Sequence, residues 1–238
     1  MASEKIIFFD IPTKAPRTAW SFNPWRTRFI LNYKGLDYET EWLEYPEIKP
    51  RLQNHVPPRE IYTVPTILMP DGTYVTDSRE IAKYLEEKYP SPSLHLDSPY
   101  IPKITAAMIA AHEPLRPIFV PLVPKRFLDE ASHPFWYRTR EETVGMSLDE
   151  YAKQGGDAAF DKVIPGLQAA TALLKEKPEG PYFNGNELGY ADFLWAGILI
   201  FWQKLGDDVF EELLKRAGDR QPHLDLLEAL KPLSAKND

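Results

Sequence analysis

SFNPWRTR, residues 21–28, is the stretch of this chain that most clearly marks the start of a helix. Pro24 suits a first helical turn because its φ is fixed and it lacks an N–H, and Asn23 is a residue type favoured as a cap. Ser21 lies upstream, near the electropositive end of that helix. The arrangement indicates either an ordinary capped helix or a place where an anion binds, and the rest of the sequence is needed to choose.

The segments around this helix predict an α/β unit in the first ninety residues. Apolar runs bounded by polar residues indicate strands, Gly35 ends the first helix, and Pro-Asp-Gly-Thr at 70–73 is hairpin turn chemistry. In chain order the predicted elements are a strand at 5–10, a helix at 24–34, a strand at 37–43, a short helix at 48–54, strands at 66–69 and 74–76, and a helix at 78–88. The order is βαβ followed by ββα.

Beyond residue 90 the pattern changes, which predicts a second domain. Serine, proline and aspartate dominate a linker at 91–99, and only helical periodicity follows it. Helices are expected at 100–128, 135–145, 157–177, 190–205, 209–217 and 222–230. Four prolines between 114 and 124 cannot all lie inside one straight helix, so the first of these segments must kink or break. The predicted domains are 1–90 and 100–238.

Composition excludes several classes of function. The net charge is −7 and no basic run is interleaved with aromatic residues, so nucleic acid is not an expected partner. The apolar window at 188–205 contains Asp192 and is interpreted as a buried core helix, not as a membrane span. The first five residues lack a signal pattern, which predicts a cytoplasmic protein. The chain has no cysteine and its histidines are scattered, so no metal site is expected and thiol chemistry must use an external sulfur.

Two further dipeptides are, like the start of the first helix, candidate ligand-binding positions. Val64-Pro65 precedes a strand, where a cis bond would turn the backbone of Val64 outward toward a peptide-like ligand. Asp77-Ser78 opens a helix, where the carboxylate could meet an α-amino group and the hydroxyl an α-carboxylate. Each dipeptide alone is equally compatible with a strand start or a helix cap.

Together, the early serine, Val64-Pro65 and Asp77-Ser78 within a βαβββα unit resemble the cytosolic glutathione transferases over essentially the whole chain. The resemblance is closest to the fungal class A (FuA) enzymes, which are related to bacterial β-etherases. It implies a thioredoxin-like α/β N-terminal domain that binds glutathione, an all-α C-terminal domain that supplies the acceptor pocket, and a homodimer. It also implies that Ser21 contacts the glutathione sulfur, Val64 pairs with the ligand backbone, Pro65 is cis, and Asp77 and Ser78 hold the γ-glutamyl group.

The mechanism implied by the resemblance is stabilisation of a thiolate. Lowering a thiol pKa from about 8.5 by about two units needs about 2.7 kcal/mol, which one hydroxyl donor and a helix N-terminus can supply. Ser21 would then donate a hydrogen bond and would not be a nucleophile. Asn23 is a second possible donor, and the sequence does not say which of the two meets the sulfur.

Two segments depart from the family pattern. The usual Ser/Thr–Xaa–Xaa–Asp capping box of the helical domain becomes Gly189-Tyr190-Ala191-Asp192, in which only the aspartate half survives. Residues for the glycyl carboxylate usually lie in the segment that corresponds to 44–62, where Gln53, His55 and Arg59 are candidates. For Arg59 a solvated surface charge is the alternative interpretation.

An aromatic acceptor pocket is expected around Trp20, Phe22, Arg116, Phe119 and Pro121. Aromatic walls and one nearby cation suit flat phenolic or aryl-ether compounds, although Phe119 fits simple core packing equally well. We therefore expect a glutathione transferase that acts on aromatic electrophiles, with conjugating activity and peroxidase or ether-cleaving side activity. The alternative is a carrier that binds aromatic metabolites on the same fold with little turnover.

Overall fold

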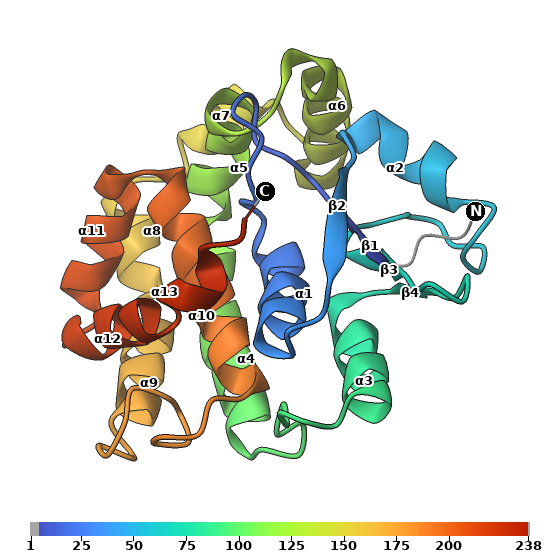
Figure 1. The fold of residues 1–238 in the computed structure, drawn as a ribbon. Coiled ribbons are helices and arrows are strands. Elements are labelled where there is room, and N and C mark those ends of the chain that lie inside the picture. The colour runs from blue at the N-terminus through green and yellow to red at the C-terminus, as the bar shows by residue number, and fades with distance from the viewer. Residues whose placement is uncertain (1–4, 238) are drawn as a thin grey trace.

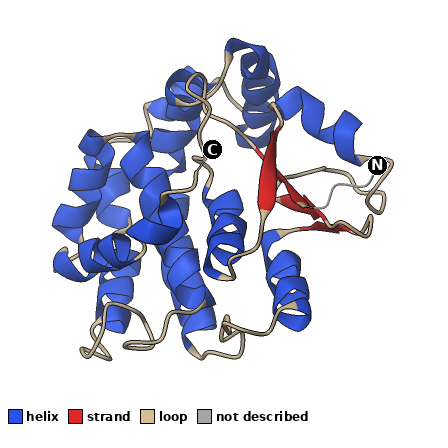
Figure 2. Cartoon of the chain, in the orientation of Figure 1, coloured by secondary structure: helices blue, strands red, loops and turns tan. Residues whose placement is uncertain are grey.

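The computed structural model describes residues 5–237, in which a small mixed sheet stands beside a larger group of helices (Figures 1 and 2). The described strands are β1 (Ile6–Asp10), β2 (Tyr38–Trp42), β3 (Thr66–Leu68) and β4 (Tyr74–Thr76), in the order β2-β1-β3-β4. β1 runs parallel to β2 and antiparallel to β3, which in turn pairs antiparallel with β4. The thioredoxin-like topology implied by the resemblance is thereby confirmed.

Side-chain alternation along β1 explains why helices cover both faces of the sheet. Phe8 points into the main core, where it packs with residues of α1 (Phe22–Tyr33) and α3 (Ser78–Lys88). Phe9 points the other way, into a smaller cluster with Ile48 and Leu52 of α2 (Tyr45–Leu52). Neither face of β1 is left to solvent, which accounts for a continuous apolar run in place of alternation.

The helices of the second part surround α10 (Tyr190–Leu205), which is buried along almost its whole length and packs against α1, α4, α11 and α12 (Figure 1). None of the described helices has the length and hydrophobicity that crossing a membrane would require. The other elements are α4 (Tyr100–His112), α5 (Arg116–Arg126), α6 (His133–Val144), α7 (Leu148–Ala152), α8 (Asp157–Lys162), α9 (Ile164–Leu174), α11 (Asp207–Arg216), α12 (Gln221–Ala229) and α13 (Lys231–Ser234), with 3₁₀ turns at Glu113–Leu115 and Glu130–Ser132.

The helical segment predicted at 100–128 is broken near its prolines, as expected, and the helix predicted at 157–177 is also divided. α4 ends at His112, the 3₁₀ turn contains Pro114, and α5 begins directly after it, although Pro121 and Pro124 lie inside α5. The helix expected over 157–177 is two helices that meet at Val163, because Pro165 lacks the N–H needed to continue the ladder of α8. The short helix α7 has no counterpart among the sequence predictions.

The surviving half of the capping box forms as expected. The Asp192 carboxylate accepts the backbone N–H of Gly189 at 2.8 Å and that of Phe183 at 2.9 Å. Gly197, five residues after Asp192 on α10, lets the start of α1 approach closely, since a Cβ there would lie 3.0 Å from the carbonyl oxygen of Phe22. The position of α1's N-terminus therefore depends on contact with the helical domain.

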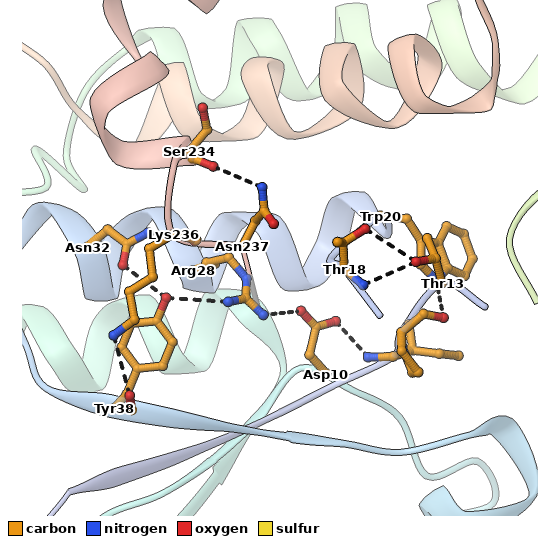
Figure 3. A network of polar contacts seen from close by, with 12 residues as sticks. Asp10, Thr13, Thr18, Trp20, Arg28, Asn32, Tyr38, Ser234, Lys236 and Asn237 are labelled. Atoms are coloured by element: carbon orange, nitrogen blue, oxygen red, sulfur yellow. Dashed lines mark hydrogen bonds and ion pairs between the residues drawn. The ribbon is translucent and has the colours of Figure 1, made fainter. Parts of the chain in front are cut away.

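A polar network in the core ties α1 to the sheet and to the C-terminal segment (Figure 3). Arg28 of α1 donates to the carboxylate of Asp10 at 2.9 Å, and both side chains are fully buried. Asn32 donates to the carbonyl of Leu233 at 2.6 Å, and the carbonyl of Asn237 accepts the N–H of Ala19 at 3.0 Å. The C-terminal segment thus holds the loop that leads into α1.

Buried His223 is expected to make stability fall as the solution is acidified. Its Nδ1 accepts from the indole N–H of Trp195 at 2.9 Å, and its Nε2 lies 2.8 Å from the Thr171 hydroxyl. Burial lowers the pKa of His223 to about 4. The unfolded chain takes up a proton near pH 6.5 while the folded chain does not, so this residue alone should lower the free energy of unfolding by roughly 2 kcal/mol between about pH 7 and about pH 5.

Urea denaturation of the wild type and of His223→Gln at several pH values would isolate this contribution, because other titrating groups are common to both proteins. The difference in unfolding free energy between the two should shrink by about that amount on acidification. Parallel pH profiles would show that His223 already titrates normally in the folded state.

Candidate functional site

A cavity of about 450 Å³ lies between the sheet-containing domain and the helical domain. Its walls come from the start of α1, the loop before β3, the start of α3, and the facing sides of α4 and α10. The lining residues are Asn23, Arg26, Thr63, Val64, Pro65, Asp77, Ser78, Arg79, Ile101, Thr105, Met108, Tyr190 and Leu194. One wall is polar and carries charges of both signs, whereas α4 and α10 contribute mostly apolar side chains.

The N-terminus of α1 carries two polar side chains, one of which lines this cavity. Ser21 is the cap residue, with extended backbone, and its hydroxyl makes no capping hydrogen bond. Asn23, two residues later, lines the cavity, whereas Ser21 does not. Because the cap is not formed by a side chain, the first N–H groups of α1 keep the partial positive charge of a helix N-terminus.

The loop before β3 presents backbone groups to the same cavity. The Val64–Pro65 peptide bond is cis, as the resemblance implied. Val64 lines the cavity, and within residues 5–237 neither its N–H nor its carbonyl has a hydrogen-bond partner. One donor and one acceptor are therefore available to the main chain of an extended ligand, in the manner of an added strand.

Asp77 and Ser78 stand together at the start of α3. Asp77 has φ +81°, in the region that disfavours a side chain, and its carboxylate accepts the N–H of Arg79 at 2.8 Å. Such a conformation costs of order 1–3 kcal/mol and is often found at functional sites. Ser78 is buried and lies beside Tyr190, whose pKa is raised by burial. The pair offers an exposed carboxylate, a hydroxyl and the backbone N–H of Ser78, because the Asp77 carboxylate already accepts the next two N–H groups of α3.

Arg26 adds a cation to the cavity one helical turn after Asn23. Its Nη2 lies 3.2 Å from the sulfur of Met108, and its guanidinium lies 5.3 Å from the ring centroid of Phe22. Burial lowers the pKa of Arg26, an effect that the Tyr190 and Asp77 side chains oppose. With Asp77 and Arg79 as the other charged lining residues, the cavity carries a net charge of one positive unit.

The aromatic residues predicted for the acceptor pocket gather elsewhere, around Phe201 of α10. The rings of Trp20, Phe22 and Phe119 lie 6.2, 5.7 and 5.6 Å from the ring of Phe201. Trp20 is buried and donates to the carbonyl of Pro12, so it belongs to the core. Phe22 is half-buried and touches Arg26, a lining residue, so the aromatic cluster adjoins the cavity without lining it.

The remaining predicted residues lie off the cavity wall. Pro121 is buried inside α5, and Arg116 lies 3.9 Å from Glu113. Arg59 is exposed in the loop after α2, with its Nε 3.4 Å from the carbonyl of Pro57. Of the other two candidates for a glycyl carboxylate, Gln53 is exposed at the end of α2 and His55 stacks on Tyr74. Within residues 5–237 no group of three or more metal-ligating side chains is found.

Several lining residues were not predicted. Arg26 could have been selected from its helical spacing of three residues from Asn23, which puts both on one face of α1. Met108, Tyr190 and Leu194 carry no local signal, because they reach the cavity only when α4 and α10 pack against α1. Chemically, the site can bind an extended zwitterion with an ionised group at the start of α1 and an apolar group toward the helical domain.

Comparison with known sequences supports this two-domain description. The sequence profile described as "Glutathione S-transferase, N-terminal domain" matches residues 20–88, and the one described as "Glutathione S-transferase, C-terminal domain" matches residues 104–224. A glutathione S-transferase-like protein of Aspergillus flavus, ustS, is 30% identical over 231 residues, which cover 87% of this chain and 83% of that protein.

Solved structures agree with the sequence comparisons. Glutathione transferase GSTFuA3 of Phanerochaete chrysosporium superposes with a TM-score of 0.84 at 28% identity over 97% of each chain. A glutathione S-transferase of Ceriporiopsis subvermispora, solved in complex with glutathione, gives a TM-score of 0.82 at 30% identity, over 96% of this chain and 97% of that one. Both resemblances extend over the two domains.

Proposed function

This chain belongs to the glutathione S-transferase family, and from that premise we propose how its cavity holds glutathione and which class of acceptor receives the glutathione sulfur. The protein is a glutathione transferase with glutathione as its co-substrate, close to the fungal FuA enzymes. The proposal concerns the residues that hold the tripeptide, the group that meets the sulfur, and the class of acceptor.

The observation that carries the proposal is one cavity in which three kinds of ligand-binding group face each other. In the proposed placement, Val64 pairs through its backbone with the cysteinyl residue of glutathione. Asp77 takes the γ-glutamyl ammonium, and Ser78 with the N-terminus of α3 takes the γ-glutamyl carboxylate. The sulfur then lies at the N-terminus of α1, where the Ser21 hydroxyl and the Asn23 amide can stabilise a thiolate.

Between the two donors, position favours Asn23 as the direct contact. Asn23 lines the cavity, whereas the Ser21 hydroxyl lies at the cap, just outside the lining residues. The serine would then act as a second donor or through a bridging water. Thiolate stabilisation by serine alone, the first expectation from the sequence, becomes a shared role in this proposal.

The acceptor we propose is an aromatic electrophile or aryl ether. The apolar side chains of α4 and α10 line the cavity together with the groups proposed to bind glutathione, and the aromatic cluster around Phe201 adjoins it through the contact of Phe22 with Arg26. Such surfaces stabilise flat aromatic rings by stacking and by burial of apolar area. A carrier of aromatic metabolites would use the same surfaces, so binding alone does not separate the two functions.

The deciding experiment measures glutathione binding by calorimetry and turnover of an aryl halide and a phenacyl aryl ether in the same preparation. Asp77→Ala and Ser78→Ala should each weaken glutathione binding by about tenfold, the usual size of a lost hydrogen bond to a charged group. Glu80→Ala, an exposed change on the same helix, is the matched control. Tight aromatic binding without turnover would favour the carrier, and no affinity for glutathione at millimolar concentration would overturn the proposal.

We also propose that the protein dimerises through two exposed isoleucines. Among the large apolar side chains of residues 5–237, Ile61 and Ile109 stand out, with 70% and 53% of their surface exposed. Ile61 lies in the loop between α2 and β3, and Ile109 lies on α4. In the proposed dimer, a two-fold axis places Ile61 of one copy against Ile109 of the second copy, and Ile109 of the first against Ile61 of the second, so that all four side chains are buried.

Replacing Ile61 by aspartate should therefore shift the protein toward monomer. Each lost anchor costs about 2 kcal/mol, and the two-fold axis makes the loss occur twice, so the dissociation constant should rise about a thousandfold. Sedimentation equilibrium measures the change, Ile109→Asp should produce the same shift, and Glu60→Ala in the same loop should not. A dimer of unchanged affinity in both isoleucine variants would place the interface elsewhere.

A further inference from the structure

Arg26 is a cation that lines the cavity, and the proposed placement of glutathione gives it no role. Within residues 5–237 no carboxylate lies within ion-pair distance of its guanidinium, and its Nε has no hydrogen-bond partner. Its contacts are the sulfur of Met108 and the ring of Phe22. By contrast, Arg28, two residues later on the same helix, is paired with Asp10.

A guanidinium without a carboxylate at contact distance is costly in such a place unless a ligand supplies the opposite charge. Removing a charged group from water is unfavourable unless it is paired, and arginine pairs with carboxylates through a planar, two-pronged fork. The desolvation is reflected in the lowered pKa of Arg26. Arg79, the other cation on the wall, is exposed and needs no such partner.

The geometry of its neighbours separates Arg26 from the proposed sites of the γ-glutamyl group and the sulfur of glutathione. In the proposed placement, both charges of the γ-glutamyl group meet Asp77 and Ser78 on α3, and the sulfur meets the start of α1. Arg26 instead lies one turn further along α1, against Met108 of α4 and the ring of Phe22. These contacts hold its guanidinium beside the apolar wall, which is the part of the cavity that the proposed placement of glutathione leaves for an acceptor.

From this arrangement, and resting on the proposed function, we propose that Arg26 selects acceptors that carry a carboxylate or another anionic group on the same aromatic framework as their electrophilic carbon. The preferred substrate class is then an acidic aromatic electrophile, with its ring on the side chains of α4 and Phe22 and its anionic group on the Arg26 fork. For a conjugated ketone, the thiolate sulfur forms a bond to the β-carbon, the double-bond electrons move toward the carbonyl oxygen, and the α-carbon then takes a proton from water.

A matched pair of acceptors tests this directly: ethacrynic acid, a conjugated aryl ketone with a carboxylate, and its methyl ester. The wild type should show a higher kcat/KM for the acid than for the ester. Arg26→Gln should reduce this ratio by about tenfold or more, the size expected for a lost charged partner, with the dissociation constant of glutathione unchanged within about twofold. Arg26→Lys, which keeps the charge, should retain most of the preference for the acid. Arg79→Gln removes the other cation of the cavity, and as the control it should leave the ratio of acid to ester unchanged.

The outcomes keep this inference separate from the proposed function. A wild type that turns over both compounds without preferring the acid, or an acid-to-ester ratio that survives Arg26→Gln, overturns the role of Arg26 while the transferase proposal stands. A tenfold or greater loss of glutathione affinity in Arg26→Gln also overturns it, because Arg26 would then serve the tripeptide. Failure of the wild type to bind glutathione would instead remove the proposed function. If Arg26→Gln does not fold, the wild type decides the question: a tenfold or greater preference in affinity for the glutathione conjugate of the acid over that of the ester supports the role of Arg26, and equal affinities overturn it.

Discussion

Replacing Arg28 by methionine is expected to lower the free energy of unfolding by about 3–5 kcal/mol. Arg28 and Asp10 are both completely buried, with 2.9 Å between Nη2 and Oδ2 (Figure 3). Methionine keeps much of the apolar stem of the arginine but leaves the Asp10 carboxylate without its counter-ion in the core. Urea denaturation, followed by tryptophan fluorescence, measures the loss.

A matched surface pair gives the scale for this prediction. Arg220 and Glu211 form an ion pair at 3.1 Å, with about half of each side chain exposed. Arg220→Met should cost no more than about 1 kcal/mol, because water already screens that pair. The double variant Arg28→Met/Asp10→Asn should cost much less than the sum of its single variants. A loss for Arg28→Met no greater than that for Arg220→Met would show that Asp10 is neutral or hydrated in the folded protein.

Replacing Asn23 by alanine should lower kcat/KM for an aryl halide by about tenfold to a hundredfold, because it removes one hydrogen-bond donor to a thiolate, worth about 1.5–3 kcal/mol. By the same argument, the pKa of enzyme-bound glutathione should rise by about one to two units, since each unit corresponds to about 1.4 kcal/mol. The pH dependence of thiolate absorbance in the binary complex measures that pKa independently of turnover.

Ser21→Ala tests the second donor and should have a smaller effect, since Ser21 lies at the cap and Asn23 lies on the cavity wall. Asn54→Ala, an exposed asparagine after α2, is the control for the substitution itself. An unchanged thiol pKa in Asn23→Ala together with a raised one in Ser21→Ala would assign the sulfur contact to the serine. No change in either variant would move the sulfur away from the start of α1.

Elements with strong local signals were predicted with nearly their observed bounds. α3 was predicted at 78–88 and α10 at 190–205, and both are found there, because a cap residue begins each and an aromatic-proline or glycine signal ends it. The short helix α7 and the division between α8 and α9 were not predicted. The five residues of α7 give too little periodicity to stand out from neighbouring segments, so this helix depends on packing against α5. The division between α8 and α9 follows from Pro165, a local signal that was overlooked within the longer helical pattern.

The same distinction holds for the candidate site. Asn23, Val64, Pro65, Asp77 and Ser78 were selected from the sequence and lie on one cavity, because each stands at the end of an element, where its chemistry leaves a readable local pattern. The acceptor residues had no such pattern. An aromatic residue that lines a pocket and one that fills a core look alike in sequence, and Trp20 and Phe119 are in the core.

The sequence by itself determined the two-domain order, the absence of a cysteine thiol, and the polar residues at the starts of α1, β3 and α3, since these follow from caps, turns and composition. Only the tertiary structure decided that Asn23 reaches the cavity wall while Ser21 does not, and that Arg26 meets Met108 across the domain boundary. The physical reason is the packing of α10 and α4 on α1: contacts between residues some eighty or more positions apart set which face of a helix is buried, and no local pattern encodes that choice.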